Sequence, residues 1–259
     1  MKHITTAFFL AIGCAQATTV ALNPSFDAYV RSDGNANGDD DTHNNINELI
    51  VGRVLANEWI RPIMQFDLSS IPDGATINSV TLTMYIGSLD TGTAGASTNS
   101  LGADGLQLVQ MSTDADFANK FTWNDQSWGA NGANGGGDDV PWTTPGGDFN
   151  STVLSSIANN VIPIKTVSSG DSFTLASSSD FVNAISSNLG DDTVQLMLRT
   201  PGIESGFNER KLIRFASSEF SNTAFRPSLT IDYTAVPEPS SAMLGGLGLL
   251  ALVTRRKRG

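Results

Sequence analysis

The stretch from Ile77 to Ile86 constrains the fold more than any other part of the chain, because apolar and polar side chains alternate along most of it. A period of two places successive side chains on opposite faces of a β-strand. In the strand-like run at residues 59–68, Pro62 predicts that part of the strand lies at a sheet edge or in a bulge, because proline lacks the N–H that a sheet requires. Further strand-like runs, separated by turn-forming residues, lie at residues 26–31, 48–54, 59–68, 105–111, 172–176, 193–199, 211–216 and 228–233.

One helix is expected shortly before residue 190. Phe181, Val182 and Ile185 share a face at helical spacing, and Ser179 or a neighbour provides the N-cap. Gly190 offers a left-handed stop at the C-terminal end. Many short strands with at most one short helix are typical of two packed sheets, so we expect an all-β fold, a jelly-roll β-sandwich over residues 18–234.

The first 17 residues have the organisation of a secretory signal peptide. Lys2 gives a basic start, an apolar stretch follows, and Ala15 and Ala17 are the small residues of a cleavage site, with cleavage expected after Ala17. The single cysteine, Cys14, lies inside this segment, and its surroundings fit a lipoprotein box poorly. The mature chain therefore has no cysteine and must fold without disulfides in an oxidising compartment.

Residues 235–259 form a second processing segment with three parts. Pro237-Glu238-Pro239 cannot be helical, because each proline fixes its own φ and restricts the residue before it. An apolar run at residues 242–253 follows, and then come four basic residues that stay on the cytoplasmic side. Those four are Arg255, Arg256, Lys257 and Arg258.

This tail resembles the PEP-CTERM sorting signal of Gram-negative bacteria. The resemblance implies that the tail inserts transiently into the inner membrane as an apolar transmembrane helix. It also implies that a sorting protease of the exosortase type processes the protein, which ends secreted or at the outer surface. The alternative, an ordinary membrane anchor, is weaker because the apolar run is shorter than the roughly 20 residues of a stable span.

The charge of the region between the two signals excludes some partners. Residues 18–236 hold 10 Lys and Arg against 25 Asp and Glu, a formal net charge of −15. A surface this acidic argues against nucleic acid and against anionic membrane surfaces as partners. It suits divalent cations, although solubility alone explains most of the charge.

Several phrases of the mature region resemble the DNRLRE domains, which are jelly-roll modules related to a carbohydrate-binding family. The clearest phrase is Phe66-Asp67-Leu68-Ser69-Ser70-Ile71-Pro72, with the strand after it. The others are Phe26-Asp27-Ala28-Tyr29-Val30, Glu48-Leu49-Ile50-Val51-Gly52 and Arg226-Pro227-Ser228-Leu229-Thr230-Ile231-Asp232-Tyr233. The resemblance implies a jelly-roll fold and polysaccharide binding.

A calcium site is expected in the loop from Asp33 to Asp41. Oxygen-bearing side chains at alternate positions, followed by Gly38, match the first half of a calcium loop. The second half does not match, because Asn44 stands where an EF-hand has a bidentate Glu. A solvated acidic loop explains the same composition equally well. The expected ligands are Asp33, Asn35, Asn37, Asp39 and Asp41.

A second candidate site is a loop region rich in tryptophan. Trp128 and Trp142 are expected to be exposed, where flat indole rings stack on sugars, with Asn131 and Asp148 binding hydroxyl groups. The alternative is that tryptophans between short strands belong to the core. We expect Trp123 in the core and Trp59, at the head of a strand, in a structural role.

Catalysis has little support in the sequence. His43 is the one histidine left after the signal peptide, so a Cys-His pair is excluded and a Ser-His-Asp triad is disfavoured. A carboxylate pair for glycoside hydrolysis cannot be read from sequence spacing. We therefore expect a non-catalytic, secreted, polysaccharide-binding protein, associated with the cell surface or exopolysaccharide and holding structural calcium. The alternatives are a structural matrix or surface protein without glycan binding and, less favoured, a polysaccharide-cleaving enzyme.

Overall fold

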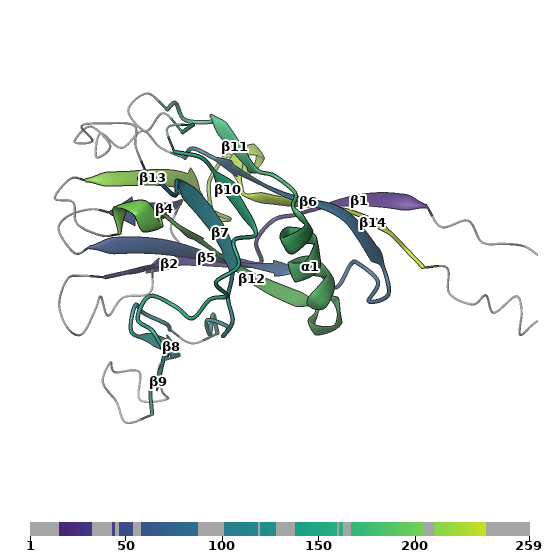
Figure 1. Cartoon of the computed structure of the whole chain (residues 1–259), viewed down its shortest axis with the longest axis horizontal. Helices are drawn as coiled ribbons and strands as arrows, with labels where there is room; N and C mark the ends of the chain where they lie inside the picture. The colour runs from purple at the N-terminus through teal and green to yellow at the C-terminus, as the bar shows by residue number, and fades with distance from the viewer. Residues whose placement is uncertain are drawn as a thin grey trace, which may run out of the picture.

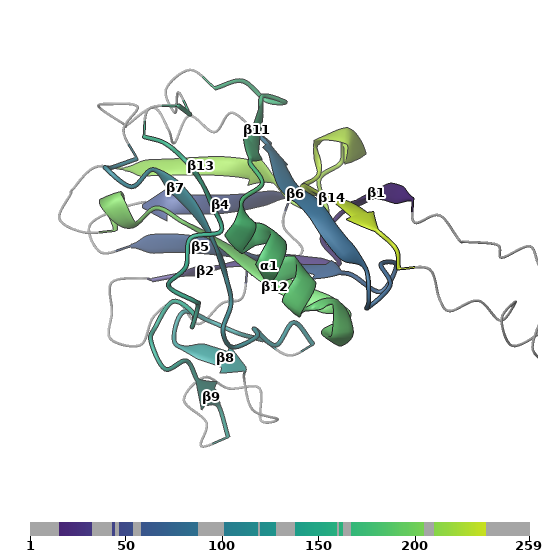
Figure 2. The same ribbon diagram turned by 45° about the vertical axis from the view of Figure 1, so that its right-hand side comes forward.

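The computed structural model describes residues 16–32, 43–44, 47–53, 58–87, 101–118, 120–127, 138–159, 161–162, 167–204 and 210–236. Within these ranges the chain forms antiparallel strands and one α-helix (Figures 1 and 2). The smaller of the two main sheets has four strands. In spatial order they are β1 (Ala17–Leu22), β14 (Ser228–Thr234), β6 (Thr76–Tyr85) and β11 (Ser172–Leu175).

Strand β6 confirms the alternating pattern and explains where that pattern breaks. Val80, Leu82 and Met84 are buried in the core, and their neighbours in sequence are more exposed. Ile77 is also buried but lies out of phase with Val80. The pairing with β14 shifts register at this point, so that Asn78 is an extra residue, and a bulge of this kind restores both apolar side chains to one face.

The larger sheet has eight strands. Its main path runs through β10 (Ser155–Ile157), β7 (Leu106–Gln110), β12 (Thr193–Arg199), β5 (Trp59–Asp67), β2 (Phe26–Arg31) and β3 (His43–Asn44). From β5 a branch leads through β4 (Glu48–Arg53) to β13 (Lys211–Ala216). Pro62 pairs with Tyr29 of β2, and it lies between the β5 residues that pair with β4, Trp59 and Ile60, and those that pair with β12, which begin at Ile63. The strand is therefore not an edge strand, but it has a local gap in its pairing at Pro62.

The two sheets pack face to face and enclose the main core. Its largest fully buried side chains include Phe66 from β5, Phe215 from β13 and Leu82 from β6. The sequence prediction of an all-β sandwich with a short helix is therefore confirmed. Figure 1 shows the strands of the larger sheet side by side, and β1 and β14 reach away from them toward the two termini.

The helix α1 (Ser179–Ser187) packs against β6 with Phe181 and Ile185 buried. Its N-cap is Ser178, whose Oγ accepts a hydrogen bond from the Phe181 N–H at 3.0 Å. The helix ends at Ser187 with Asn188 as its C-cap, close to the predicted end, but the left-handed conformation predicted at Gly190 is wrong. A 3-10 helix (Leu189–Asp191) continues the chain, and the left-handed residue is Asp192, with φ 58°. Asp is among the few non-glycine residues that adopt this conformation readily.

Shorter elements complete the described part of the chain. A small hairpin joins β8 (Asp125–Ser127) to β9 (Val140–Pro141), and 3-10 helices occur at Pro201–Ile203 and Thr223–Phe225. The turn predicted at residues 71–74 is present, with the Ala75 N–H donating to the Pro72 carbonyl at 2.8 Å.

A second, smaller core lies on the outer face of the larger sheet. On β5, Met64 and Phe66 point into the sandwich, whereas Ile63, the residue before Met64, points outward. The described parts of the segment from 112 to 149, which are 112–118, 120–127 and 138–149, cover this outer face with Phe121, Trp123 and Trp142. This covering segment positions the candidate site.

Candidate functional site

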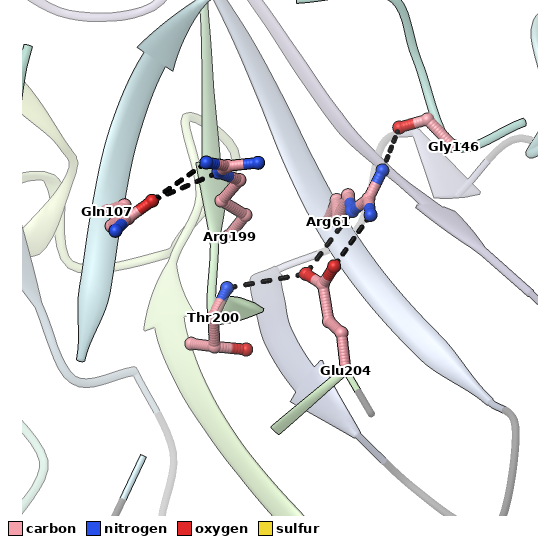
Figure 3. A network of polar contacts seen from close by, with 6 residues as sticks. All are labelled: Arg61, Gln107, Gly146, Arg199, Thr200 and Glu204. Carbon is pink, nitrogen blue, oxygen red and sulfur yellow. Dashed lines mark hydrogen bonds and ion pairs between the residues drawn. The ribbon is translucent and has the colours of Figure 1, made fainter. Parts of the chain in front are cut away.

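A row of polar side chains crosses the outer face of the larger sheet beside the second core. Arg61 comes from β5, Arg199 from β12 and Gln107 from β7, which are neighbouring strands (Figure 3). Arg199 and Gln107 are directly paired across β12 and β7. Glu204, which follows the 3-10 helix after β12, and Gly146 of the covering segment complete the network (Figure 3).

Arg61 is fixed by a two-point ion pair. Its Nη2 and Nε donate to the two carboxylate oxygens of Glu204 at 2.6 and 3.3 Å, and its Nη1 donates to the Gly146 carbonyl at 3.0 Å. The guanidinium carbon also lies 4.9 Å from the centre of the Trp123 ring. Gly146 has φ 92°, and a Cβ there would lie 2.6 Å from Arg61 Nη1 and 2.7 Å from the Trp123 ring, so glycine is required.

Arg199 has a different environment, although it lies beside Arg61. Its Nε and Nη2 both donate to the neutral amide oxygen of Gln107, at 3.2 and 2.9 Å. Its guanidinium carbon lies 4.6 Å from the centre of the Phe149 ring. Partial burial lowers the pKa of Arg199, an effect that the nearby Glu204 carboxylate opposes. Among the described residues no carboxylate lies within ion-pair distance of this guanidinium.

A depression of about 300 Å³ opens next to Phe149. The described residues that line it are mostly polar, and they are Ser112, Thr113, Thr143, Thr144, Gly147, Asp148 and Phe149. Asp148 shapes the depression, because its Oδ2 and Oδ1 accept hydrogen bonds from the N–H groups of Thr143 and Thr144 at 2.8 and 2.9 Å. Hydroxyl groups, a carboxylate and one aromatic ring can together bind a polyhydroxylated ligand.

One tryptophan, Trp142, is buried where the sequence predicted exposure. Trp142 is only 4% exposed, and its Nε1–H donates to the Thr122 carbonyl at 2.9 Å. The expected exposure of Trp142 is therefore wrong, because the hairpin folds this ring into the second core, where it cannot stack on a sugar. Trp123 belongs to that core, as predicted, and Trp59 packs against its edge. Trp128 and Asn131 lie outside the described residues.

The remaining predicted sites also lie mainly outside the described part of the chain. This holds for the loop from Asp33 to Asp41, for Ala15 and for the tail from Pro237 onward. Ala17 begins β1 and pairs with Thr234 of β14, so the two processing segments adjoin neighbouring strand ends. In the ranges that the structure describes, no group of three or more His, Asp or Glu could hold a metal ion, and no helix has the length and apolarity to cross a membrane.

Apart from this row of polar side chains, the carboxylates of Asp27 and Glu219 interact through Ser218. Asp27, at the start of β2, is 4% exposed, and its Oδ2 accepts the Ser218 N–H at 2.7 Å. Ser218 Oγ lies 3.1 Å from Asp27 Oδ1 and 2.7 Å from Glu219 Oε1. Burial raises the pKa of Asp27 to about 7, and the negative charge of Glu219 acts in the same direction.

Sequence reasoning did not identify Arg61, Arg199, Gln107 or Asp27 as candidates. A usable signal exists for the two arginines, because each stands two residues along its strand from an apolar outward side chain, Ile63 for Arg61 and Met197 for Arg199. No comparable signal exists for their partners. Glu204 is 143 positions from Arg61, and Ser218 is 191 positions from Asp27.

Comparison with known proteins bears on the C-terminal tail. A family profile described as the PEP-CTERM protein-sorting motif matches residues 235–258. No curated protein sequence matches the chain. The resemblance of the mature region to DNRLRE domains stays a prediction.

The profile match confirms the sequence reading of the tail. The motif begins directly after β14, so the sandwich leads straight into its sorting signal. The chain therefore carries the signal of a secreted or cell-surface protein that an exosortase-type sorting system processes in Gram-negative bacteria.

Proposed function

We propose that the protein binds polysaccharide without cleaving it, on the outer face of the larger sheet. The observation that carries this proposal is the polar depression at Phe149, which offers hydroxyl groups, the Asp148 carboxylate and an aromatic residue. Sugar hydroxyls need both donors and acceptors, and their ring faces need a flat apolar surface. The resemblance to carbohydrate-binding modules and the sorting signal, which brings the protein to the cell surface or exopolysaccharide, support the same function.

The strand order supports a jelly roll. Eight strands divide into two sets of four, in the spatial orders β1-β14-β6-β11 and β5-β12-β7-β10. The first and last strands are neighbours, and from β5 onward the chain crosses repeatedly between the sheets. This is the pairing of two linked Greek keys, with β2, β3, β4 and β13 added at one edge. A broad sheet face that receives a chain-like ligand is compatible with this architecture.

A non-catalytic role fits the chemistry of the depression. Asp148 is the one carboxylate among the described residues of the lining, and both of its oxygens already accept backbone N–H groups. Glycoside hydrolysis requires two carboxylates on either side of the scissile bond. We therefore propose binding alone, with the matrix-protein alternative as the outcome if no glycan binds.

The test is binding of the purified full chain to a panel of neutral and acidic polysaccharides, with Asp148→Asn beside the wild type. We expect wild-type binding and a loss of roughly tenfold in affinity for Asp148→Asn, because one charged acceptor is lost. Asp73→Asn changes an exposed turn residue that is not among the described lining residues, so it is the matched control and should bind as the wild type does. Absence of binding across the panel would contradict the proposal and favour a structural surface protein.

We also propose that the loop from Asp33 to Asp41 binds calcium through its own oxygen-bearing side chains. A specific site stabilises the folded state by about 3 kcal/mol when free Ca²⁺ is about 100 times its dissociation constant. The melting temperature should then rise by several degrees with Ca²⁺ but not with Mg²⁺, and the Asp33→Asn/Asp39→Asn double variant should lose the rise. A melting temperature that does not respond to Ca²⁺ would leave the loop as a solvated acidic segment.

A further inference from the structure

Arg199 is a partly buried positive charge whose nearest hydrogen-bond partner is neutral. Two of its nitrogens are tethered to one amide oxygen of Gln107, and its flat face lies against Phe149. Figure 3 shows the remaining terminal nitrogen pointing away from Gln107, with no dashed line to any residue drawn. Neighbouring Arg61, by contrast, is neutralised by Glu204 at 2.6 Å.

An arginine with a neutral hydrogen-bond partner is unusual here, because residues 18–236 have a formal net charge of −15. Partial burial makes the charged form of a guanidinium more costly, and an anion close to it offsets that cost. The chain provides carboxylates in abundance, yet within its described residues it places none at ion-pair distance from Arg199. The group is therefore positioned to receive an anion from outside.

Phe149 connects this charge to the depression. Phe149 is one of the residues that line the depression, and its ring lies against the Arg199 guanidinium. A ligand whose hydroxyl groups lie in the depression can therefore extend past Phe149 to Arg199. Gln107 and Phe149 hold the guanidinium in place, which reduces the entropy lost when it binds.

We propose that Arg199 binds the carboxylate of a uronate sugar, so that the site selects polysaccharides in which uronates are separated by neutral units. This inference rests on the proposed polysaccharide binding. A planar guanidinium matches a carboxylate in shape and hydrogen-bond direction. A densely charged polyanion is excluded, because Asp148 lines the same depression and the protein as a whole is strongly acidic.

The experiment compares each acidic polysaccharide with its carboxyl-reduced form, in which every uronate becomes a neutral sugar on the same backbone. Hyaluronan, whose glucuronates alternate with neutral sugars, and densely charged polygalacturonate serve as the two acidic probes. Binding is measured by calorimetry with the full chain of the wild type, Arg199→Gln, Arg199→Lys and the control Arg226→Gln. Arg226 is suitable because it lies before β14 of the other sheet, where its Nε donates to the Phe220 carbonyl.

We expect the wild type to bind hyaluronan roughly tenfold more tightly than its reduced form, and more tightly than polygalacturonate. Arg199→Gln should lose that preference while it retains binding to the reduced form, Arg199→Lys should keep part of it, and Arg226→Gln should keep all of it. Equal wild-type affinity for native and reduced forms would overturn the inference and leave the proposed function intact. Failure to bind any native or reduced polysaccharide would overturn both.

Discussion

Replacement of Glu204 by Gln is expected to lower the free energy of unfolding by about 2 to 3 kcal/mol. The side chains of Arg61 and Glu204 are only 12% and 14% exposed, and the guanidinium lies against the Trp123 ring. Glutamine preserves the size of the side chain but removes its charge, so Arg61 would remain desolvated without a counter-ion. Breaking one side of a buried pair costs more than the pair itself contributes, because the remaining charge stays buried.

Urea unfolding followed by tryptophan fluorescence measures this loss, and Glu58→Gln is the matched control. Glu58 pairs with Arg31 at 2.8 Å, a similar distance, but the Arg31 side chain is 34% exposed and water can solvate it. That variant should lose less than about 1 kcal/mol. Equal losses in the two variants would show that burial of Arg61 adds nothing to the strength of its ion pair.

Local patterns predicted much of the fold. The alternation in β6 and β14, the turn at residues 71–74 and the apolar face of α1 each follow from neighbouring residues, and the structure contains them. The strands that the sequence did not indicate are short or atypical. β10 (Ser155–Ile157) has three residues, and β1 (Ala17–Leu22) begins at the expected signal cleavage site, where its alternation is weak.

The site was far less predictable than the fold, because tertiary contacts create it. Trp142 follows Pro141 among polar loop residues and suggests exposure, yet the hairpin turns it into a core that local sequence does not reveal. Asp148 was identified as a candidate binding residue, and it lines the depression. The arginine row depends on the registers of β5, β12 and β7 and on the position of Glu204 after the 3-10 helix Pro201–Ile203, so no spacing in the sequence predicts which residues come together.

The second large effect is a fall in stability as the pH rises toward neutrality, with Asp27 as its source. The pKa of Asp27 is raised from 3.8 to about 7 in the folded protein, chiefly because burial penalises the charged carboxylate. The geometry agrees, because Ser218 Oγ has a single hydrogen and lies between oxygens of Asp27 and Glu219. A proton on Asp27 can be donated to Ser218 Oγ, whose own hydrogen then goes to Glu219, so the protonated form completes the chain of hydrogen bonds.

The sign of the pH dependence follows from the direction of the shift. A folded-state pKa above the unfolded value means that the folded protein binds the proton more tightly. The resulting stabilisation is fully present below pH 3.8 and is lost as the pH rises through about 7, and a shift of this size corresponds to at most about 4 kcal/mol. Asp27→Asn removes the titrating group and keeps an oxygen that can accept the Ser218 N–H.

The free energy of unfolding should therefore be measured from pH 4 to 8 for the wild type and for Asp27→Asn, and the difference between them taken at each pH. Subtraction removes the contribution of the other carboxylates, which both proteins share. We expect Asp27→Asn to gain stability relative to the wild type as the pH rises, and to exceed it above pH 7. Asp67→Asn is the control of opposite sign, because hydrogen bonds from Ser69 lower the pKa of Asp67 and its contribution is lost only as the pH falls. A difference in unfolding free energy between Asp27→Asn and the wild type that stays constant across this range would contradict the prediction. It would show that Asp27 is ionised in the folded protein throughout, and that the hydrogen-bond chain through Ser218 does not stabilise its protonated form.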